Sequence, residues 1–202
     1  AALKKGTVLG EAEIAALVAA GHDAVIAAQL DADDLPEDRA ASLVGAAVAG
    51  AGVRAAEAAT GRCNLHAEVA GVLLVDRPRV DRLNLVDEAV TLATIAPFAP
   101  VRAGDMVATV KVIPFAARRD VVASCASIAA GAALSVAPFR PFRAGLILTR
   151  LPGVSEGVLD RAASAQRVRA ARLGGAIGRE LRCAHDEIEV ASDLIDRGEG
   201  EQ

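Results

Sequence analysis

Residues 146–186, LILTRLPGVSEGVLDRAASAQRVRAARLGGAIGRELRCAHD, have the pattern of a strand and helix unit that repeats once. A short apolar run bounded by turn residues predicts a buried strand, and a longer run with apolar residues at helical spacing predicts a helix. The expected elements are a strand over 146–149, a turn at Pro152 and Gly153, a helix over 156–173, a strand over 177–183 and a last helix opened by His185 and Asp186. This order predicts a βαβα unit, and two strands are too few to complete a parallel sheet.

The rest of the chain alternates between apolar strands and amphipathic helices, which predicts the α/β class from end to end. The expected helices cover 11–20, a segment from Asp33 or Asp34 to about 50, and 119–131, and residues 77–84 are expected to form a helix or a turn. The expected strands cover 24–30, 53–58, 69–75, 89–95, 106–113 and 134–137, with 89–95 and 106–113 forming a hairpin-like pair. Residues 138–143 are interrupted by proline, so we divide the chain into an N-terminal α/β region over 1–143 and a partial α/β domain over 144–202.

Composition excludes several classes of function. Hydrophobic residues make up 53% of the 202 residues and aromatic residues only 2%, so the chain has an aliphatic core and is not intrinsically disordered. The formal net charge of −4 and the lack of Trp and Tyr argue against nucleic acid as a partner. Residues 61–145 hold ten bases and seven acids, and this mildly basic segment suits a small anionic ligand.

Cysteine usage and hydropathy give an expectation about location. The three cysteines, Cys63, Cys125 and Cys183, are far apart and lack CxxC spacing, so we expect neither a disulfide framework nor a zinc site. A reducing, cytoplasmic compartment follows as the expectation. We expect no signal peptide, because the opening residues 1–6 lack an apolar run. We also expect no membrane partner, because polar residues and Pro138 interrupt the most apolar stretch of the chain.

Polar residues follow both strands of the C-terminal unit. Thr149 and Arg150 lie where the first strand ends, and Asp186 lies where the second strand ends and the last helix begins. Open α/β sheets bind ligands at this edge, so these three residues form a candidate site for an anion or a polyol. The alternative for Asp186 is an ordinary helix N-cap, which would stabilise its helix by about 1 kcal/mol.

A second polar cluster lies at residues 60–64. Its backbone N–H groups and Arg62 suit an anion, with Asn64 beside them, and the alternative is a simple β-turn. Lys111 alternates with apolar neighbours in a strand, so it points either to solvent or toward this candidate anion site. No two of the three histidines lie at helical spacing from each other, and no metal site is expected.

Three runs carry a resemblance to a known family. Residues 60–65 (TGRCNL), 83–94 (LNLVDEAVTLAT) and 106–115 (MVATVKVIPF) resemble a bacterial family of molybdopterin-binding proteins, as does the opening KGTVL at 5–9 with the helix after it. That family is a divergent relative of the molybdopterin molybdotransferases of molybdenum cofactor biosynthesis. The resemblance implies a family-specific N-terminal region followed by a three-layer α/β/α molybdopterin-binding domain that starts near Ala144.

The resemblance also implies a site and partners. Thr149 matches a Ser or Thr that contacts the phosphate side of the pterin, and Asp186 matches the acidic residue that opens the helix after the second strand. Where the superfamily continues to an acidic residue, this chain has Arg150, and the glycine-rich loop of the catalytic relatives would follow one strand later than residue 202. We therefore expect the chain by itself to lack a complete pterin site. Molybdopterin is the expected ligand, with contacts from Thr149, Asp186 and Arg150.

Two other functions stay open at this stage. The first is a non-catalytic interaction module that docks a molybdoenzyme or another protein of the cofactor pathway, which suits the acidic first third of the chain. The second is an unrelated protein that binds a small anion through Arg62, Asn64 and Lys111. The resemblance and an unfinished sheet edge both favour a homo-oligomer.

Overall fold

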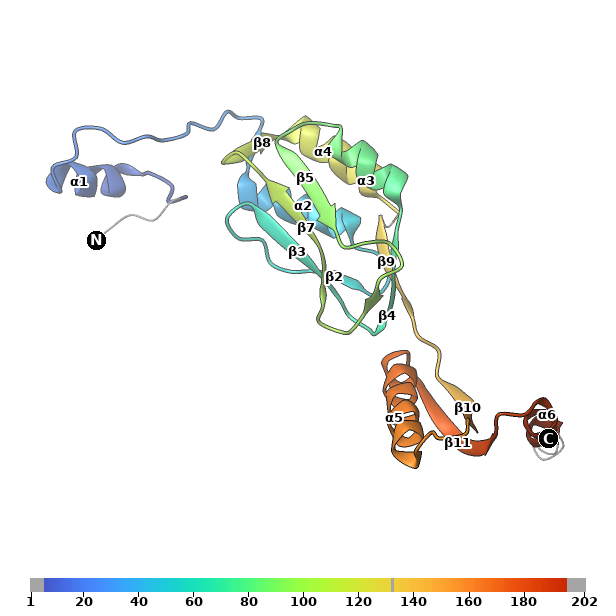
Figure 1. The fold of residues 1–202 in the computed structure, drawn as a ribbon. Coiled ribbons are helices and arrows are strands. Elements are labelled where there is room, and N and C mark those ends of the chain that lie inside the picture. Colours follow the sequence, from blue (N-terminus) through green and yellow to red (C-terminus); the bar gives the residue numbers. More distant parts are fainter. Residues whose placement is uncertain (1–5, 132, 196–202) are drawn as a thin grey trace. The chain divides into compact units, whose positions relative to one another are not determined.

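The computed structural model describes residues 6–131 and 133–195 of the chain. These residues form two compact units, Ala1–Ala137 and Pro138–Gln202, each with its own helices and strands. The boundary lies at the start of the proline-interrupted stretch 138–143, six residues before the division expected from the sequence. Both units combine helices and strands, consistent with the α/β class, although in the first unit several strands follow one another without a helix between them (Figure 1).

The first unit combines helices with short strands. Its helices are α1 (Glu11–Ala19), α2 (Glu37–Val48), α3 (Arg77–Asn84) and α4 (Arg119–Ala129). Its strands are β1 (Asp34–Pro36), β2 (Val53–Ala55), β3 (Arg62–Ala67), β4 (Gly71–Val75), β5 (Val90–Thr94), β6 (Pro100–Val101), β7 (Met106–Val112), β8 (Ala116–Arg118) and β9 (Leu134–Pro138). The expected helices at 11–20, 77–84 and 119–131 are confirmed to within two residues.

A four-stranded antiparallel sheet in the order β2-β3-β7-β5 is the largest sheet of the first unit. Strands β5 and β7 pair directly, with Leu92 opposite Val110, so the expected hairpin-like pair is confirmed. One face of the sheet is buried under α2. Cys63, Leu65 and Val110 on this face are fully buried, while their neighbours along the strands are not. Strand β3 was not expected from the sequence, although its alternating burial is clear.

Two smaller sheets complete this unit. Strands β6, β4 and β9 form a three-stranded sheet, and β1 pairs with β8 through Leu35 opposite Ala117. Helices α2 and α4 begin directly after β1 and β8 with Pro36 and Arg118 as their N-caps, so the expected Asp33 or Asp34 cap is wrong. Asp34 instead accepts a hydrogen bond from the Asp31 N–H at 3.0 Å, which belongs to the turn before β1.

The core of the first unit is aliphatic, as the composition predicts. Its largest fully buried side chains are Leu65, Leu73, Leu83, Leu134, Val44, Val48, Val90, Val107, Val110, Val112 and Val122. At the free edge of β5, the Asn84 side chain donates to the Leu92 carbonyl at 2.9 Å and accepts from the Leu92 N–H at 2.7 Å. Asn84 therefore takes the place of a neighbouring strand at that edge.

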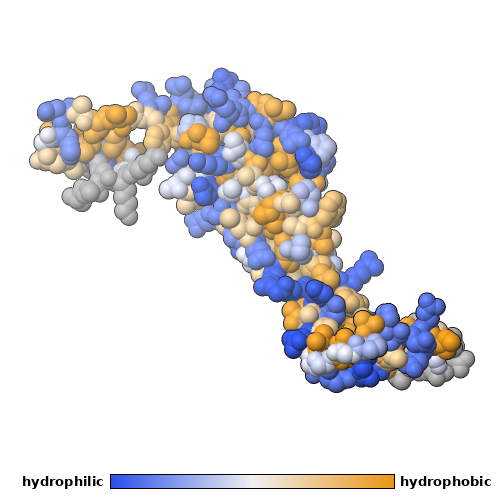
Figure 2. All heavy atoms as spheres, viewed as in Figure 1, coloured by the Kyte–Doolittle hydropathy of each residue, from blue (hydrophilic) through white to orange (hydrophobic). Residues whose placement is uncertain are grey.

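Residues 6–33 form one helix and an exposed segment. Helix α1 has no buried residue, and Ile14 and Val18 are 52% and 67% exposed (Figure 2). The expected strand over 24–30 is wrong, because these residues are exposed and pair with no strand among the described residues. An apolar run forms a strand only when another strand offers it hydrogen-bonding partners.

The second unit has the expected βαβα order. It consists of β10 (Phe142–Arg150), α5 (Glu156–Arg172), β11 (Gly175–Ala184) and α6 (Glu187–Ile195). Strands β10 and β11 are parallel, and α5 connects them. In the described residues no helix combines the length and the apolar character that a membrane crossing needs.

Candidate functional site

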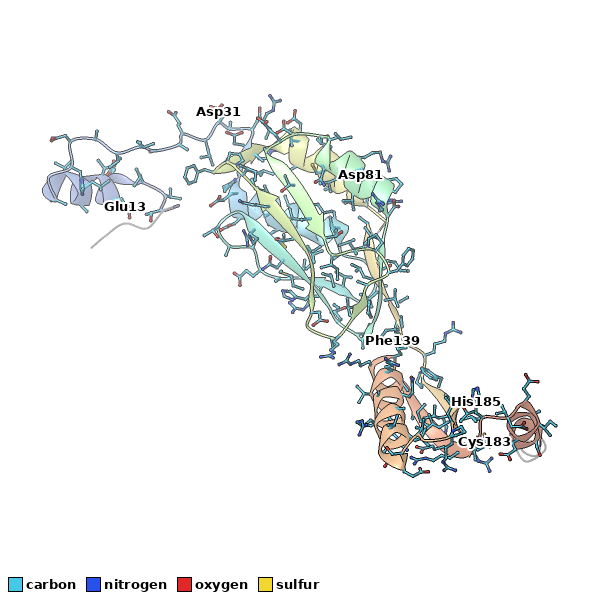
Figure 3. The ribbon with its side chains drawn as sticks, viewed as in Figure 1. Glu13, Asp31, Asp81, Phe139, Cys183 and His185 are labelled. Atoms are coloured by element: carbon cyan, nitrogen blue, oxygen red, sulfur yellow. The ribbon has the colours of Figure 1, made fainter. Side chains whose placement is uncertain are left out.

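The carboxyl ends of β10 and β11 lie side by side, because the two strands are parallel and in register. Thr149 is opposite Cys183, and Arg150 is opposite Ala184. The chain therefore brings Thr149 and Arg150 from one strand next to His185 and Asp186 from the end of the other. Figure 3 labels His185 at the end of β11, close to Cys183. This is the edge at which the sequence places a candidate ligand site.

Thr149 and His185 are in direct contact. The Thr149 Oγ1 lies 2.8 Å from His185 Nδ1, and the His185 backbone N–H donates to the Arg150 carbonyl at 3.1 Å. Two contacts therefore hold His185, one to its imidazole and one to its backbone N–H. Because Nδ1 is engaged, the second ring nitrogen, Nε2, remains for an external group, and no described group lies within hydrogen-bonding distance of it.

His185 is the residue that sequence reasoning missed. No second histidine lies at helical spacing from it, and Glu189, four residues later, binds the Ala184 N–H with its carboxylate, so the spacing does not mark a metal site. Its place directly after a parallel strand was the signal that could have identified it, because the first residues beyond such strands line the ligand-binding edge.

Asp186 caps helix α6. Its Oδ1 accepts from the N–H groups of Ile188 at 2.9 Å and Glu189 at 3.2 Å, and the Glu189 carboxylate accepts from the Ala184 N–H at 2.9 Å. This reciprocal arrangement is a helix-capping interaction, and it holds α6 against the end of β11. The structure thus confirms the N-cap interpretation, and the Asp186 oxygen that faces the helix is already engaged.

Arg150 belongs to an ion-pair network over helix α5. Its guanidinium binds Glu156 at 2.5 Å, and Glu156 also accepts from Arg182 at 2.7 Å. Arg182 binds Asp160 and Glu180 as well, at 2.7 Å and 2.6 Å. Hydrogen bonds from Arg182, and then from Arg150, hold the pKa of Glu156 below its usual range.

The network leaves part of Arg150 available. Glu156 engages the Nη2 group of Arg150, whereas a guanidinium carries five N–H donors in a planar fork. Glu156 would keep its contact with Arg182 if Arg150 turned toward a ligand. The strand ends therefore present an imidazole, a hydroxyl and part of a guanidinium, all of which bind phosphate oxygens.

Arg62 and Asn64 lie in the first unit, on β3. The Asn64 Oδ1 accepts from the Thr109 hydroxyl at 2.9 Å, and Arg62 is exposed opposite Lys111. The Gly61 N–H, which the sequence offers to an anion, already donates to the Asp38 carboxylate at 2.7 Å. The chain itself thus supplies the anion for that backbone group.

Neither metal geometry nor known proteins add to this description. Among residues 6–131 and 133–195, no three His, Cys, Asp or Glu side chains are grouped so that they could hold a metal ion. No protein-family model matches the chain, and no curated protein or solved structure matches it either.

Proposed function

We propose that the C-terminal unit binds molybdopterin, with its phosphate at the carboxyl ends of β10 and β11. The observation that carries the proposal is the Thr149–His185 pair, which lies beside Arg150 at this edge of a parallel sheet. The resemblance of the chain to molybdopterin-binding proteins supplies the identity of the ligand. The donors that the edge presents suit the phosphate, and we assign them no contact with the pterin ring.

Each residue has a stated role in this proposal. The Thr149 hydroxyl orients His185, and the Nε2 of His185 and the free N–H groups of Arg150 bind phosphate oxygens. Asp186 holds the N-terminus of α6 at the end of β11 and acts through that positioning. The protein would belong to the biosynthesis or delivery of the molybdenum cofactor, as a cytoplasmic homo-oligomer with a three-layer α/β/α C-terminal domain.

The test measures binding of molybdopterin to the full chain by the fluorescence anisotropy of the pterin. Because the chain has no Trp or Tyr, protein emission does not interfere with this signal. We expect Thr149→Val, His185→Gln and Arg150→Gln each to raise the Kd at least tenfold, and Thr149→Ser to bind nearly as the wild type does. Arg161→Gln is the matched control, because Arg161 is exposed on α5 and forms no ion pair among the described residues.

Two results would count against the proposal. One is no binding by the wild-type chain at concentrations at which a known molybdopterin-binding protein is saturated. The other is an equal loss of binding in Arg150→Gln and Arg161→Gln, which would show a general effect of charge and no site at the strand ends.

A second candidate function is docking of a protein from the molybdenum cofactor pathway. Exposed apolar side chains favour it, since Ile188 on α6 is 79% exposed and Val168 on α5 is 51% exposed. Ile188→Ser and Val168→Ser should then abolish capture of a molybdoenzyme by the immobilised chain and leave molybdopterin binding unchanged. The opposite pattern, loss of capture with Thr149→Val alone, would assign the interaction to the bound cofactor.

A further inference from the structure

The outer face of the sheet β2-β3-β7-β5 is open and cationic. Helix α2 packs against the buried face, and it lies behind these strands in Figure 1. By strand alternation and register, the side chains on the opposite face are Arg54, Arg62, Asn64, His66, Thr91, Ala93, Met106, Thr109 and Lys111. No acidic residue is among them.

Two like charges lie directly opposite each other on this face. Arg62 of β3 is the register partner of Lys111 of β7, and both side chains are exposed. Directly opposed residues of an antiparallel pair have Cβ atoms about 5 Å apart, and like charges there destabilise the pairing. Neither residue forms an ion pair with any described carboxylate, and the Asp38 carboxylate nearby accepts from the Gly61 N–H at 2.7 Å.

The neighbouring positions supply neutral donors. Two residues further along β3, Asn64 is opposite Thr109 of β7, and the Thr109 hydroxyl donates to the Asn64 Oδ1 at 2.9 Å. This bond orients the half-buried amide and leaves its Nδ2 hydrogens without an acceptor among the described residues. On the other side of Lys111, its register partner on β5 is Thr91, which presents a hydroxyl on the same face.

We propose that this face binds a small phosphate-bearing molecule, with one phosphoryl group held between Arg62 and Lys111 and contacted by the Asn64 amide. A guanidinium fork and a compact ammonium are the two side chains that proteins use for phosphate oxygens. A small ligand fits better than a nucleic acid, because the face has no aromatic side chain for stacking and the chain carries a net charge of −4. The site uses residues of the first unit alone and goes beyond the proposed function at the strand ends.

The experiment titrates the full chain with pyrophosphate and follows the backbone amide signals of β3, β5 and β7 by NMR. We expect shifts at Arg62, Asn64 and Lys111, and at least a tenfold rise of the Kd in Arg62→Gln and in Lys111→Gln. Arg102→Gln is the matched control, since Arg102 is exposed in the turn before β7 and its side chain forms no ion pair with a described carboxylate, while its backbone N–H keeps its hydrogen bond to Asp105. It should bind pyrophosphate as the wild type does.

A second readout separates a binding site from a structural role. Without ligand, Arg62→Gln and Lys111→Gln should melt at the wild-type temperature or above it, because each substitution removes a like-charge contact. Pyrophosphate should then raise the melting temperature of the wild type and of Arg102→Gln, and raise that of the two site variants less. A loss of stability in both ligand-free variants, or equal binding by Arg62→Gln and Arg102→Gln, would overturn the proposal.

Two further measurements identify the class of ligand and separate this site from the site at the strand ends. A single-stranded oligonucleotide that bound this face more than tenfold tighter than pyrophosphate would assign it to nucleic acid and overturn the small-molecule proposal. Thr149→Val should leave the shifts of Arg62 and Lys111 unchanged. Failure of molybdopterin binding at the strand ends would therefore not affect the result for pyrophosphate at the outer face. Failure of pyrophosphate binding at the outer face would likewise not affect the result for molybdopterin at the strand ends.

Discussion

The contact between α2 and β3 predicts an unusual cost for a glycine-to-alanine substitution in a helix. Gly45 is buried in α2, and a Cβ added there would overlap the Cys63 Sγ and lie 3.2 Å from the Cys63 Cβ and 3.8 Å from the Ala55 Cβ. Alanine favours a helix interior by up to about 1 kcal/mol over glycine. Overpacking of a dense core costs about 1–3 kcal/mol, so we expect Gly45→Ala to destabilise the protein by about 1–2 kcal/mol.

A double-mutant cycle isolates the cause. Cys63→Ala alone removes one buried atom beyond Cβ and should cost about 1 kcal/mol. It also removes the sulfur that the new methyl group meets, so the double variant should be more stable than the sum of the single effects by at least about 1 kcal/mol. Urea denaturation followed by far-UV circular dichroism measures these free energies, and hydrogen exchange of α2 and β3 peptides locates the change.

The result that would refute this reasoning is additivity. If Gly45→Ala is neutral or stabilising, or if the two substitutions add within about 0.3 kcal/mol, then α2 does not pack against Cys63 as closely as the structure has it. Ala46→Gly is a suitable control, because Ala46 is the exposed neighbour of Gly45 on the same helix. It should cost only the loss of helix propensity, about 1 kcal/mol.

Three further measurements test other parts of the structure. Gly175→Ala should destabilise the protein by at most about 1 kcal/mol, because its Cβ would overlap the outer end of the Phe142 ring, which is 42% exposed and can turn away, and Phe142→Leu should recover part of the loss in urea denaturation. Burial, with a smaller contribution from nearby charge, raises the pKa of Cys125 to about 11. The contribution of Cys125 to stability should therefore be constant below pH 9 and fall between pH 9 and pH 11, and Cys125→Ala should flatten that slope. Hydrogen bonds from Arg182 and Arg150 lower the pKa of Glu156. The contribution of Glu156 to the free energy of unfolding should therefore be present above the ordinary carboxylate pKa and lost as the pH falls through the lowered pKa. Glu156→Gln should remove this part of the acid sensitivity, as measured by circular dichroism of pH titrations.

The sequence predicts elements well where their pattern is local. Helix α3 begins at Arg77 and ends at Asn84 as expected, because Asp76 caps it and Leu83 gives it a buried contact. The pairs β1–β8 and β3–β7 join residues far apart in the chain, such as Leu35 with Ala117, and no local pattern shows such a pairing. Strand β3 was missed for a related reason, since Gly61 and Asn64 resemble a turn although Cys63, Leu65 and Ala67 alternate as a buried strand does.

The candidate site was predictable in place and less so in its chemistry. The ends of two parallel strands locate Thr149, Arg150 and Asp186 together from the sequence, because such strands end at one edge. Whether each polar group is available depends on contacts that spacing does not determine. Arg150 binds Glu156, six residues later, across a turn whose geometry depends on the positive φ of Gly153.

A polar residue therefore remains a candidate for ligand binding only if some of its donors or acceptors have no partner inside the chain, whatever its residue type. The Gly61 N–H and the Asp186 carboxylate have partners inside the chain, so each contributes to stability at its position. The opposed cations Arg62 and Lys111 have no described partner and repel each other, so they cost stability in the folded state. An anion bound between the two side chains would relieve this repulsion, and it is the interaction that their charge and register would accommodate.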